Sequence, residues 1–316
     1  MGAVTSRVIR FHELGEPLDV LRDELAEIPD PGAGAVRVRV AATGLNPADW
    51  ELCRGFMPGP LPRGIGYDVA GTVEAIGAGV EDVGLGDLVF GVSQYAAQPS
   101  AGAADHALLT LWFAVPAGLD AVHAAVLPMV VQTAHWTLDL MDVRPGETVL
   151  VHGAGGMVGY AAVQIALRRG ARVIATAGPT FAPDLAALGA IVTQYGEGMV
   201  DRVRSLAEGP VDHVLDVSRP NAGAVAALVE IAGDPRRVVT ISNHDEARSN
   251  GARVNIDELR ATGRFPSSDM LADYASLAAT GEFTLPIART FPLAQWHAAA
   301  ELSLSGAPHG KVVLVP

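Results

Sequence analysis

The sequence predicts an α/β protein in which a doubly wound parallel sheet is combined with a separate β-rich domain. Two observations support this prediction. Residues 1–115 contain many short strands separated by glycine and proline, which is typical of a small barrel-like unit. The middle of the chain instead alternates apolar strands with helices, which favours a parallel sheet covered on both faces.

The strands of the β-rich part show the expected alternation. Val36–Leu45 alternates apolar and basic residues, as a strand with one buried face should. Asp68–Val80 is predicted as a strand followed by glycine turns, and Gly86–Val92 as a turn into another strand.

The middle of the chain supplies the alternating pattern. Its predicted strands are Thr148–His152, Ala171–Thr176, Val211–Ser218 and Arg236–Ser242. Its predicted helices are Ala121–Met141, Tyr160–Arg169, one beginning in Asp184–Leu188, and Ala222–Ala232. Pro128 should break or kink the first of these helices, because proline cannot continue the helical hydrogen bonding.

The tail changes character again. Phe283–Thr290 and Lys311–Val315 are predicted strands, with the helix Ala294–Leu304 between them. We expect this tail to return to the first domain or to bridge the two.

Composition excludes several classes of function. Hydrophobic residues make up 49% of the 316 residues, and the net charge is −13, which disfavours nucleic acid or an anionic membrane as a partner. The single cysteine, Cys53, excludes an internal disulfide and a cysteine-based structural metal site. The N-terminus shows no secretory h-region, and the longest apolar runs are far shorter than the roughly 20 residues of a membrane span. We therefore expect a cytoplasmic globular protein.

The most informative stretch is VLVHGAGGMVGYAAVQIALRRGARVIATAG. An apolar strand ends at His152, and a glycine-rich turn then leads into a helix and a second strand. In this setting small residues allow the tight turn, the approach of the backbone to a pyrophosphate, and the close packing of helix on sheet. The pattern predicts a Rossmann dinucleotide site, as opposed to a structural glycine turn, formed by Gly153, Ala154, Gly155, Gly156, Met157, Val158 and Gly159.

The end of the second strand bears on the choice of dinucleotide. An NAD site usually carries Asp or Glu there, whereas this strand ends Ala175-Thr176-Ala177-Gly178. The missing carboxylate favours NADP(H) over NAD(H), although no Arg or Lys follows immediately. The polar candidates for the ribose phosphate are Thr176, Thr180 and Tyr195, and Tyr195 can equally be a surface loop residue.

Several motifs in order resemble the medium-chain dehydrogenase/reductase superfamily, and within it the zinc-independent quinone oxidoreductase-like branch. Besides the glycine motif, the matching segments are Gly44–Trp50, Gly66–Val80, Gly86–Val92, Ala124–Leu138, Leu188–Ala190 and Gly310–Pro316. The resemblance implies a GroES-like catalytic domain formed by residues 1–122 and the tail, 283–316, with a Rossmann domain, 123–282, inserted between them. It also implies a homodimer that reduces quinones, enones or other activated double bonds of small molecules with NADPH.

The resemblance also bears on zinc. Zinc-dependent relatives carry a Cys near the position of Asn46 and a His in a Gly-His-Glu motif, where this chain has Asn46 and Tyr67. Nine histidines are present, but no pair has a convincing ligand spacing. We expect no metal.

Three residues are catalytic candidates. By resemblance, Asn46 lies beside the nicotinamide and donates to a substrate carbonyl; the alternative is a turn residue before Pro47. Tyr67 either donates a proton, lines the pocket or packs in the core. Thr133 matches a threonine near the nicotinamide ring, and its alternative is a helix residue bonded back to a carbonyl.

Other positions are candidates for binding. Trp50, Phe56 and Tyr95 would form an apolar wall for a planar substrate, although each can be a core residue. Gln132 either contacts substrate or faces solvent. Asn243 follows a strand at the edge where ligands gather, so it is a candidate cofactor contact. For Asp49 we favour a role at a helix N-terminus, and for Cys53 a buried, inert thiol.

Three functions remain open. The first is reduction of a quinone or of an activated C=C or C=O bond. The second is an enoyl or ketone reduction that tailors a complex biosynthetic intermediate, with residues 90–106 as a substrate loop. The third is a structural or sensing protein that binds NADP(H) without turnover.

Overall fold

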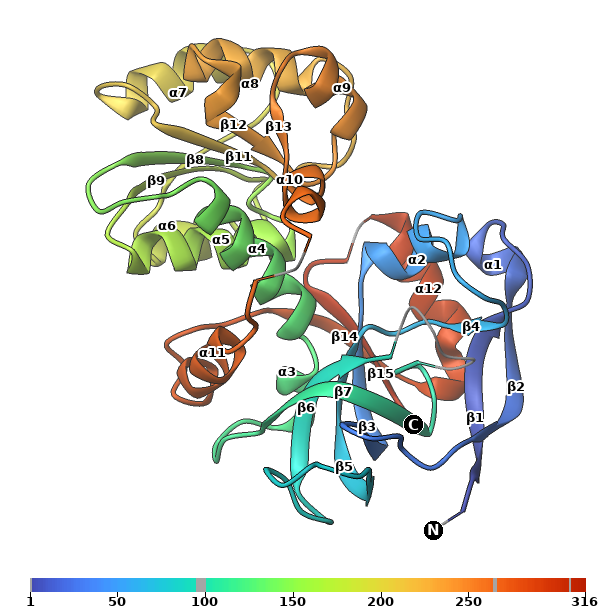
Figure 1. The fold of residues 1–316 in the computed structure, drawn as a ribbon. Coiled ribbons are helices and arrows are strands. Elements are labelled where there is room, and N and C mark those ends of the chain that lie inside the picture. Colours follow the sequence, from blue (N-terminus) through green and yellow to red (C-terminus); the bar gives the residue numbers. More distant parts are fainter. Residues whose placement is uncertain (1, 95–100, 264–265, 307) are drawn as a thin grey trace. The chain divides into compact units, whose positions relative to one another are not determined.

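The computed structural model describes residues 2–94, 101–263, 266–306 and 308–316, and the chain divides into two compact units (Figure 1). Unit 1 consists of Met1–Met129 and Asp269–Pro316, and unit 2 of Val130–Ser268. The sequence suggested changes of domain at 122/123 and 282/283. The second change falls earlier because α11 (Met270–Ala279) lies against β7 (His106–Ala114) of unit 1.

The centre of unit 1 is a small sheet that closes on itself. Strand β3 (Val36–Leu45) pairs with β5 (Asp68–Ile76), β5 with β6 (Leu88–Ser93), β6 with β7, and β7 again with β3. The closed sheet surrounds a buried cluster made of Val36, Val38, Val40, Val69, Val73, Val89, Ala107 and Leu109. The alternation seen in the sequence thus places the valines of β3 inside.

The tail returns to unit 1, as one of the two expectations had it. Strand β15 (Lys311–Val315) lies between β14 (Ile287–Pro292) and β3, and runs antiparallel to β3. Strand β14 begins later than predicted, because Phe283 instead packs its ring against Tyr274, with centroids 4.9 Å apart.

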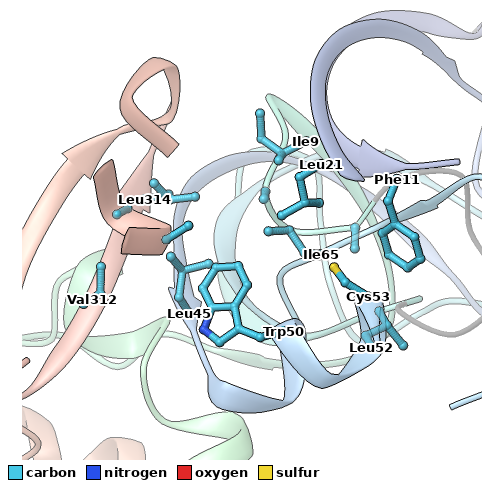
Figure 2. Close-up of a cluster of buried hydrophobic side chains, with 14 of the residues drawn as sticks. Ile9, Phe11, Leu21, Leu45, Trp50, Leu52, Cys53, Ile65, Val312 and Leu314 are labelled. Carbon is cyan, nitrogen blue, oxygen red and sulfur yellow. The ribbon is translucent and has the colours of Figure 1, made fainter. Parts of the chain in front are cut away.

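A second apolar cluster of unit 1 lies between its N-terminal hairpin and the tail (Figure 2). It includes Ile9, Phe11, Leu21, Leu45, Trp50, Leu52, Cys53, Ile65, Val312 and Leu314. The elements that supply or flank it are β1 (Val4–Phe11), α1 (Pro17–Val20), β2 (Leu21–Ile28), α2 (Pro47–Cys53), β4 (Arg63–Gly64), the 3₁₀ turn η2 (Leu293–Gln295) and α12 (Trp296–Ser305).

Unit 2 is a doubly wound sheet. Its six strands are parallel and lie in the order β10-β9-β8-β11-β12-β13. Their bounds are β8 (Thr148–His152), β9 (Arg172–Thr176), β10 (Ile191–Thr193), β11 (His213–Asp216), β12 (Val238–Thr240) and β13 (Arg253–Val254). The strand order reverses between β8 and β11, where such folds bind their ligands.

Helices cover both faces of this sheet (Figure 1). Their bounds are α5 (Met157–Arg168), α6 (Ala182–Ala187), α7 (Met199–Ala207), α8 (Ala224–Ala232), the 3₁₀ turn η1 (Pro235–Arg237), α9 (His244–Ser249) and α10 (Asn255–Ala261). The doubly wound prediction is therefore confirmed.

The chain enters unit 2 along α4 (Pro128–Leu140), and the sequence predicted a break or kink at Pro128. The expected helix Ala121–Met141 is broken into α3 (Ala121–Ala124) and α4 (Pro128–Leu140). Pro128 occupies the first position of α4, where its missing N–H leaves no helical hydrogen bond unmade. Among the helices of the described residues, none is long and apolar enough to cross a membrane.

Candidate functional site

The glycine-rich turn of unit 2 follows β8 and leads into α5. Gly153 has φ +89°, and a Cβ there would lie 2.7 Å from the backbone nitrogen of Ser218. A Cβ on Gly159 would lie 2.7 Å from the carbonyl oxygen of Gly153, whereas one on Gly155 would meet nothing within 4 Å. The packing of the protein itself therefore requires glycine at positions 153 and 159. At Gly155 no protein atom is close, so the backbone there is open to a bound group. The N–H groups of the first turn of α5 have no acceptor inside the helix and suit a pyrophosphate.

Two side chains support the turn from below. The Thr176 hydroxyl lies 2.8 Å from Nδ1 of His152 and accepts a 3.0 Å hydrogen bond from the backbone N–H of Gly153. Thr176 is fully buried, so a direct contact with the ribose would require these bonds to break. Burial lowers the pKa of His152, against the opposing charge of Asp216, so the imidazole is neutral at physiological pH.

A buried polar network joins the carboxyl ends of β11 and β12. Asn243 Nδ2 donates to Asp216 Oδ2 at 2.7 Å, and Asn243 Oδ1 accepts from the N–H of Asn221 at 2.9 Å. Ser218 and Thr240 also donate to the Asp216 carboxylate. Asn243 thus lies at the expected edge of the sheet, where it holds two loops together.

A hollow lies beyond the end of β9. It is lined by Ala177, Gly178, Pro179, Gln194 and Tyr195, none of which is acidic. The side chain of Tyr195 is 61% exposed, and Thr180 is exposed nearby in the chain. Arg202 of α7 supports the loop that carries Tyr195, because it donates to the carbonyl oxygens of Gln194 and Glu197 at 2.9 and 2.7 Å. An anionic group would meet no carboxylate on the walls of this hollow.

Unit 1 contains a buried ionic cluster, which we define as Asn46, Asp49, Asp68 and Lys311. Asn46 Nδ2 donates to Asp68 Oδ2 at 2.9 Å, and Lys311 Nζ donates to Asn46 Oδ1 at 2.5 Å. Lys311 Nζ also lies 3.4 Å from Asp68 Oδ2. All four residues are at most 4% exposed.

The two carboxylates of the ionic cluster also accept hydrogen bonds from backbone N–H groups. Asp49 Oδ2 accepts the N–H of Asn46 and Oδ1 that of Gly66, at 2.8 and 2.7 Å. Asp68 Oδ1 accepts the N–H of Met129, in the first turn of α4, at 2.8 Å. Asp49 therefore braces the start of α2, in line with the helix N-terminal role favoured from the sequence.

Burial shifts the ionisation of this cluster. Burial raises the pKa of Asp49 to about 6, although its two backbone donors oppose the shift. Burial also raises the pKa of Asp68, against the Lys311 charge, and lowers the pKa of Lys311, against the Asp68 charge.

The surroundings leave the Asn46 amide no spare donor. Its second Nδ2 hydrogen faces the carbonyl oxygen of Gly44 at 3.2 Å. A hydrogen bond from Asn46 to a substrate carbonyl, as predicted from the sequence, would therefore displace Gly44 or Asp68.

The remaining candidates fall into different environments. Thr133 is half-buried, and its hydroxyl makes no hydrogen bond to the described residues; its carbonyl accepts from the Thr137 hydroxyl at 2.7 Å. Tyr67 is half-buried against the cluster of Figure 2. Gln132 is buried and donates to the Ser268 hydroxyl at 2.8 Å.

The proposed apolar wall is not assembled by the described residues. Trp50 is a core residue whose Nε1 donates to Ser303 Oγ at 2.9 Å, while Phe56 is 45% exposed. Tyr95 lies outside the described residues. Cys53 is buried, and burial raises the pKa of its thiol to about 12, which agrees with the expected inert thiol.

Metal ligands are not gathered in the described part of the chain, where no group of three or more His, Cys, Asp or Glu side chains could hold an ion. The carboxylates of the ionic cluster are already bonded to Lys311, Asn46 and backbone N–H groups. These residues therefore do not fit a zinc site. Four of the nine histidines have these partners: His106 with Glu74, His123 with Asp120, His135 with Asp139, and His152 with Thr176.

Sequence reasoning missed three charged residues of these sites. Lys311 offered a signal, because it is the one charged residue in the otherwise apolar strand KVVLV. Asp68 and Asp216 offered little, because a carboxylate at a strand end is common on protein surfaces.

Known proteins match both units. Residues 32–126 match the family described as alcohol dehydrogenase GroES-like domain, and residues 188–314 match the one described as zinc-binding dehydrogenase. A solved alcohol dehydrogenase superfamily protein from Novosphingobium aromaticivorans is 29% identical and has a TM-score of 0.82, with 99% of this chain and 100% of that one covered. The chain belongs to the medium-chain dehydrogenase/reductase superfamily. As a superfamily member it is an oxidoreductase that uses a nicotinamide cofactor.

Two further likenesses of this superfamily member are informative. The spectinabilin polyketide synthase system protein NorB of Streptomyces orinoci is 32% identical over 306 residues, which is 92% of this chain and 14% of that protein. The chain therefore spans only a small part of this relative. The quinone oxidoreductase from Coxiella burnetii, at 24% identity with 99% and 100% of the two chains covered and a TM-score of 0.82, shares the fold.

Proposed function

We propose that this chain is a zinc-independent, NADPH-dependent reductase that transfers hydride to a carbon–carbon double bond conjugated to a carbonyl group. The observation that supports it most is the environment of Asn46. At a position where zinc relatives carry a ligand, this side chain is bonded to an ammonium and a carboxylate. Such a cluster offers charge and hydrogen bonding but no Lewis acid.

The chemistry of a conjugated alkene suits this cluster. NADPH, when bound, supplies the hydride from C4 of its nicotinamide ring. Negative charge then develops on the carbonyl oxygen of the acceptor, and a fixed positive charge or hydrogen-bond donor stabilises it. The turn at 153–159 would hold the pyrophosphate, and the free Thr133 hydroxyl would face the nicotinamide end.

The preference for NADPH rests on the hollow beyond β9. None of its lining residues repels a 2′-phosphate, and Tyr195 offers an exposed phenol. Arg202 adds a positive charge that holds the same loop. These features replace the carboxylate that an NAD site would place there.

The likeness to polyketide synthases supports an enoyl-type acceptor, because it covers 92% of the chain at 32% identity. The test is a panel of acceptors with the purified chain and NADPH. The panel contains the N-acetylcysteamine thioester of crotonic acid, para-benzoquinone and cyclohexanone. We expect NADPH consumption with the thioester, less with the quinone, and none with the ketone.

Each other outcome has a clear meaning. Turnover with the quinone alone favours a quinone reductase and contradicts the enoyl assignment. Turnover of cyclohexanone that a chelator abolishes contradicts the zinc-independent mechanism. Tight NADPH binding without turnover of any acceptor favours a structural or sensing protein.

A further inference from the structure

We propose that Lys311 is the cationic group of the active site. In this role its ammonium fixes the orientation of the Asn46 amide and stabilises the oxyanion formed by hydride transfer. This inference rests on the proposed reductase function.

The geometry of the ionic cluster defines the orientation of Asn46. An ammonium can only donate hydrogen bonds and a carboxylate can only accept them. Lys311 Nζ lies 2.5 Å from one end of the amide, and Asp68 Oδ2 lies 2.9 Å from the other. The amide oxygen must therefore face Lys311, and the amide nitrogen must face Asp68. Asp68 holds the nitrogen end of the amide, and Lys311 gives the oxygen end its donor, so the two charges together hold the amide in one orientation.

Lys311 also keeps a donor in reserve. Its ammonium carries three hydrogens, and the described residues accept two of them, at Asn46 Oδ1 and Asp68 Oδ2. By contrast, both amide hydrogens of Asn46 are engaged. In the ionic cluster, the group that can still donate is therefore the lysine.

Stability alone gives little reason for a lysine here. A buried ion pair is often no more stabilising than apolar side chains of similar size, because both charges lose their hydration. The other residues of β15 are all apolar, and Lys311 is only 4% exposed. We therefore explain the charge at this position by its effect on the Asn46 amide and on the oxyanion.

The step balances with NADPH, which would become NADP⁺ as it gives up the hydride, and one water molecule. Hydride adds to the β-carbon and breaks the C=C π bond, whose electron pair moves through the α-carbon to the carbonyl oxygen. The resulting enolate is stabilised by the Lys311 charge. Water then gives a proton to the α-carbon and leaves as hydroxide, and Lys311 is unchanged at the end.

A first experiment tests the effect of the Lys311 charge on cofactor binding and needs no turnover. The nicotinamide ring of NADP⁺ carries a positive charge, and that of NADPH does not. We expect Lys311→Met to shift the ratio of the two dissociation constants toward NADP⁺ by about five- to tenfold, and Asp68→Asn to shift it toward NADPH. Equal changes for both cofactor forms would overturn the proposal.

A second experiment separates chemistry from folding. Lys311→Met combined with Asp68→Asn removes both charges, so neither is left buried alone. We expect this folded double variant to lose about 100-fold in kcat with the crotonyl thioester, while the KM for NADPH changes less than about threefold. A folded double variant with the wild-type kcat would show that the pair is only structural.

A matched control uses another ion pair of unit 1, in which the arginine is buried and the glutamate is partly exposed. Arg37 Nε donates to Glu74 Oε1 at 2.6 Å, so Arg37→Met with Glu74→Gln removes a similar pair elsewhere. This control should leave kcat and the cofactor ratio unchanged. If the wild-type protein turns over no acceptor, the proposed function fails. The opposite changes in the ratio of NADP⁺ and NADPH dissociation constants, expected for Lys311→Met and Asp68→Asn, still test whether the Lys311 charge acts on the bound cofactor.

Discussion

The two units of this reductase hold their polar site residues in different ways. In unit 2 the glycine-rich turn comes from seven consecutive residues, 153–159, which follow β8 and include the start of α5. In unit 1 the ionic cluster brings together residues from α2, β5 and β15, and Lys311 is separated from Asn46 by 265 positions. The first site depends on backbone shape, whereas the second depends on opposite charges meeting after the whole unit has folded. The two should therefore respond differently to substitution.

The largest expected effect tests whether the ionic cluster depends on charge balance. Lys311→Met leaves Asp68 buried without its cation, so we expect the free energy of unfolding to fall by about 3–5 kcal/mol. Adding Asp68→Asn should recover most of this loss. Urea denaturation of both variants measures it, and equal losses in both would show that packing, rather than charge, dominates here.

The pH dependence of stability is the next largest effect. In the folded protein the pKa of Asp49 is about 6, above its ordinary value of 3.8. Between these values the folded chain holds a proton that the unfolded chain has lost, so the contribution of Asp49 falls as pH rises from about 4 to about 6. Relative to Asp49→Asn, wild type should lose about 3 kcal/mol over this range and then stay level.

The reference variant Asp49→Asn does not titrate, so the acid sensitivity of other carboxylates cancels in the difference. Chemical denaturation at a series of pH values provides the measurement. If the free energy of unfolding of wild type, relative to Asp49→Asn, stays level or rises between about pH 4 and about pH 6, the raised pKa of Asp49 is contradicted. The contrast between the two units would then be weaker.

The glycine turn should respond to shape instead. Gly159→Ala places a methyl group 2.7 Å from the carbonyl oxygen of Gly153, which we expect to destabilise the protein by about 1–3 kcal/mol. Gly155→Ala meets no protein atom, so its stability should stay within about 0.5 kcal/mol of wild type. Both should weaken NADPH binding, measured by fluorescence titration. Unchanged NADPH affinity in Gly155→Ala would mean that this backbone does not face the pyrophosphate.

The smallest expected effect concerns the hollow beyond β9. Tyr195→Phe removes one hydroxyl from a side chain that is 61% exposed, so the fold should be unaffected. We expect NADPH to bind about three- to tenfold more weakly, as for the loss of one hydrogen bond, and NADH affinity to stay the same. Equal weakening of both cofactors would place the 2′-phosphate elsewhere.

The sequence was sufficient to predict features that depend on residues close together in the chain. The glycine turn, the break at Pro128 and the strands β3, β8 and β15 follow from spacing and alternation within a few residues of one another. The 193–197 loop and its support by Arg202 depend on a contact from the following helix, which no periodic pattern indicates.

The ionic cluster was found only in part. Asn46 was chosen because of the resemblance, and its predicted role as a donor did not anticipate that Asp68 and Gly44 would take both hydrogens. Lys311 was visible as a charge in an apolar strand, but its partners depend on the pairing of β15 with β3. Thr176 was predicted as a contact of the ribose phosphate, but the sequence did not indicate that it is buried with its hydroxyl 2.8 Å from His152 Nδ1.

The pairing of β15 with β3 has a consequence for the order in which the molecule can form. Unit 2 is one continuous segment and can complete its sheet as soon as Ser268 has left the ribosome. Unit 1 cannot, because Asp49 and Asp68 are made early and their cation arrives only with β15. Until then, closing unit 1 would enclose uncompensated negative charge. A chain truncated before Lys311 would therefore have a complete unit 2 and an incomplete unit 1.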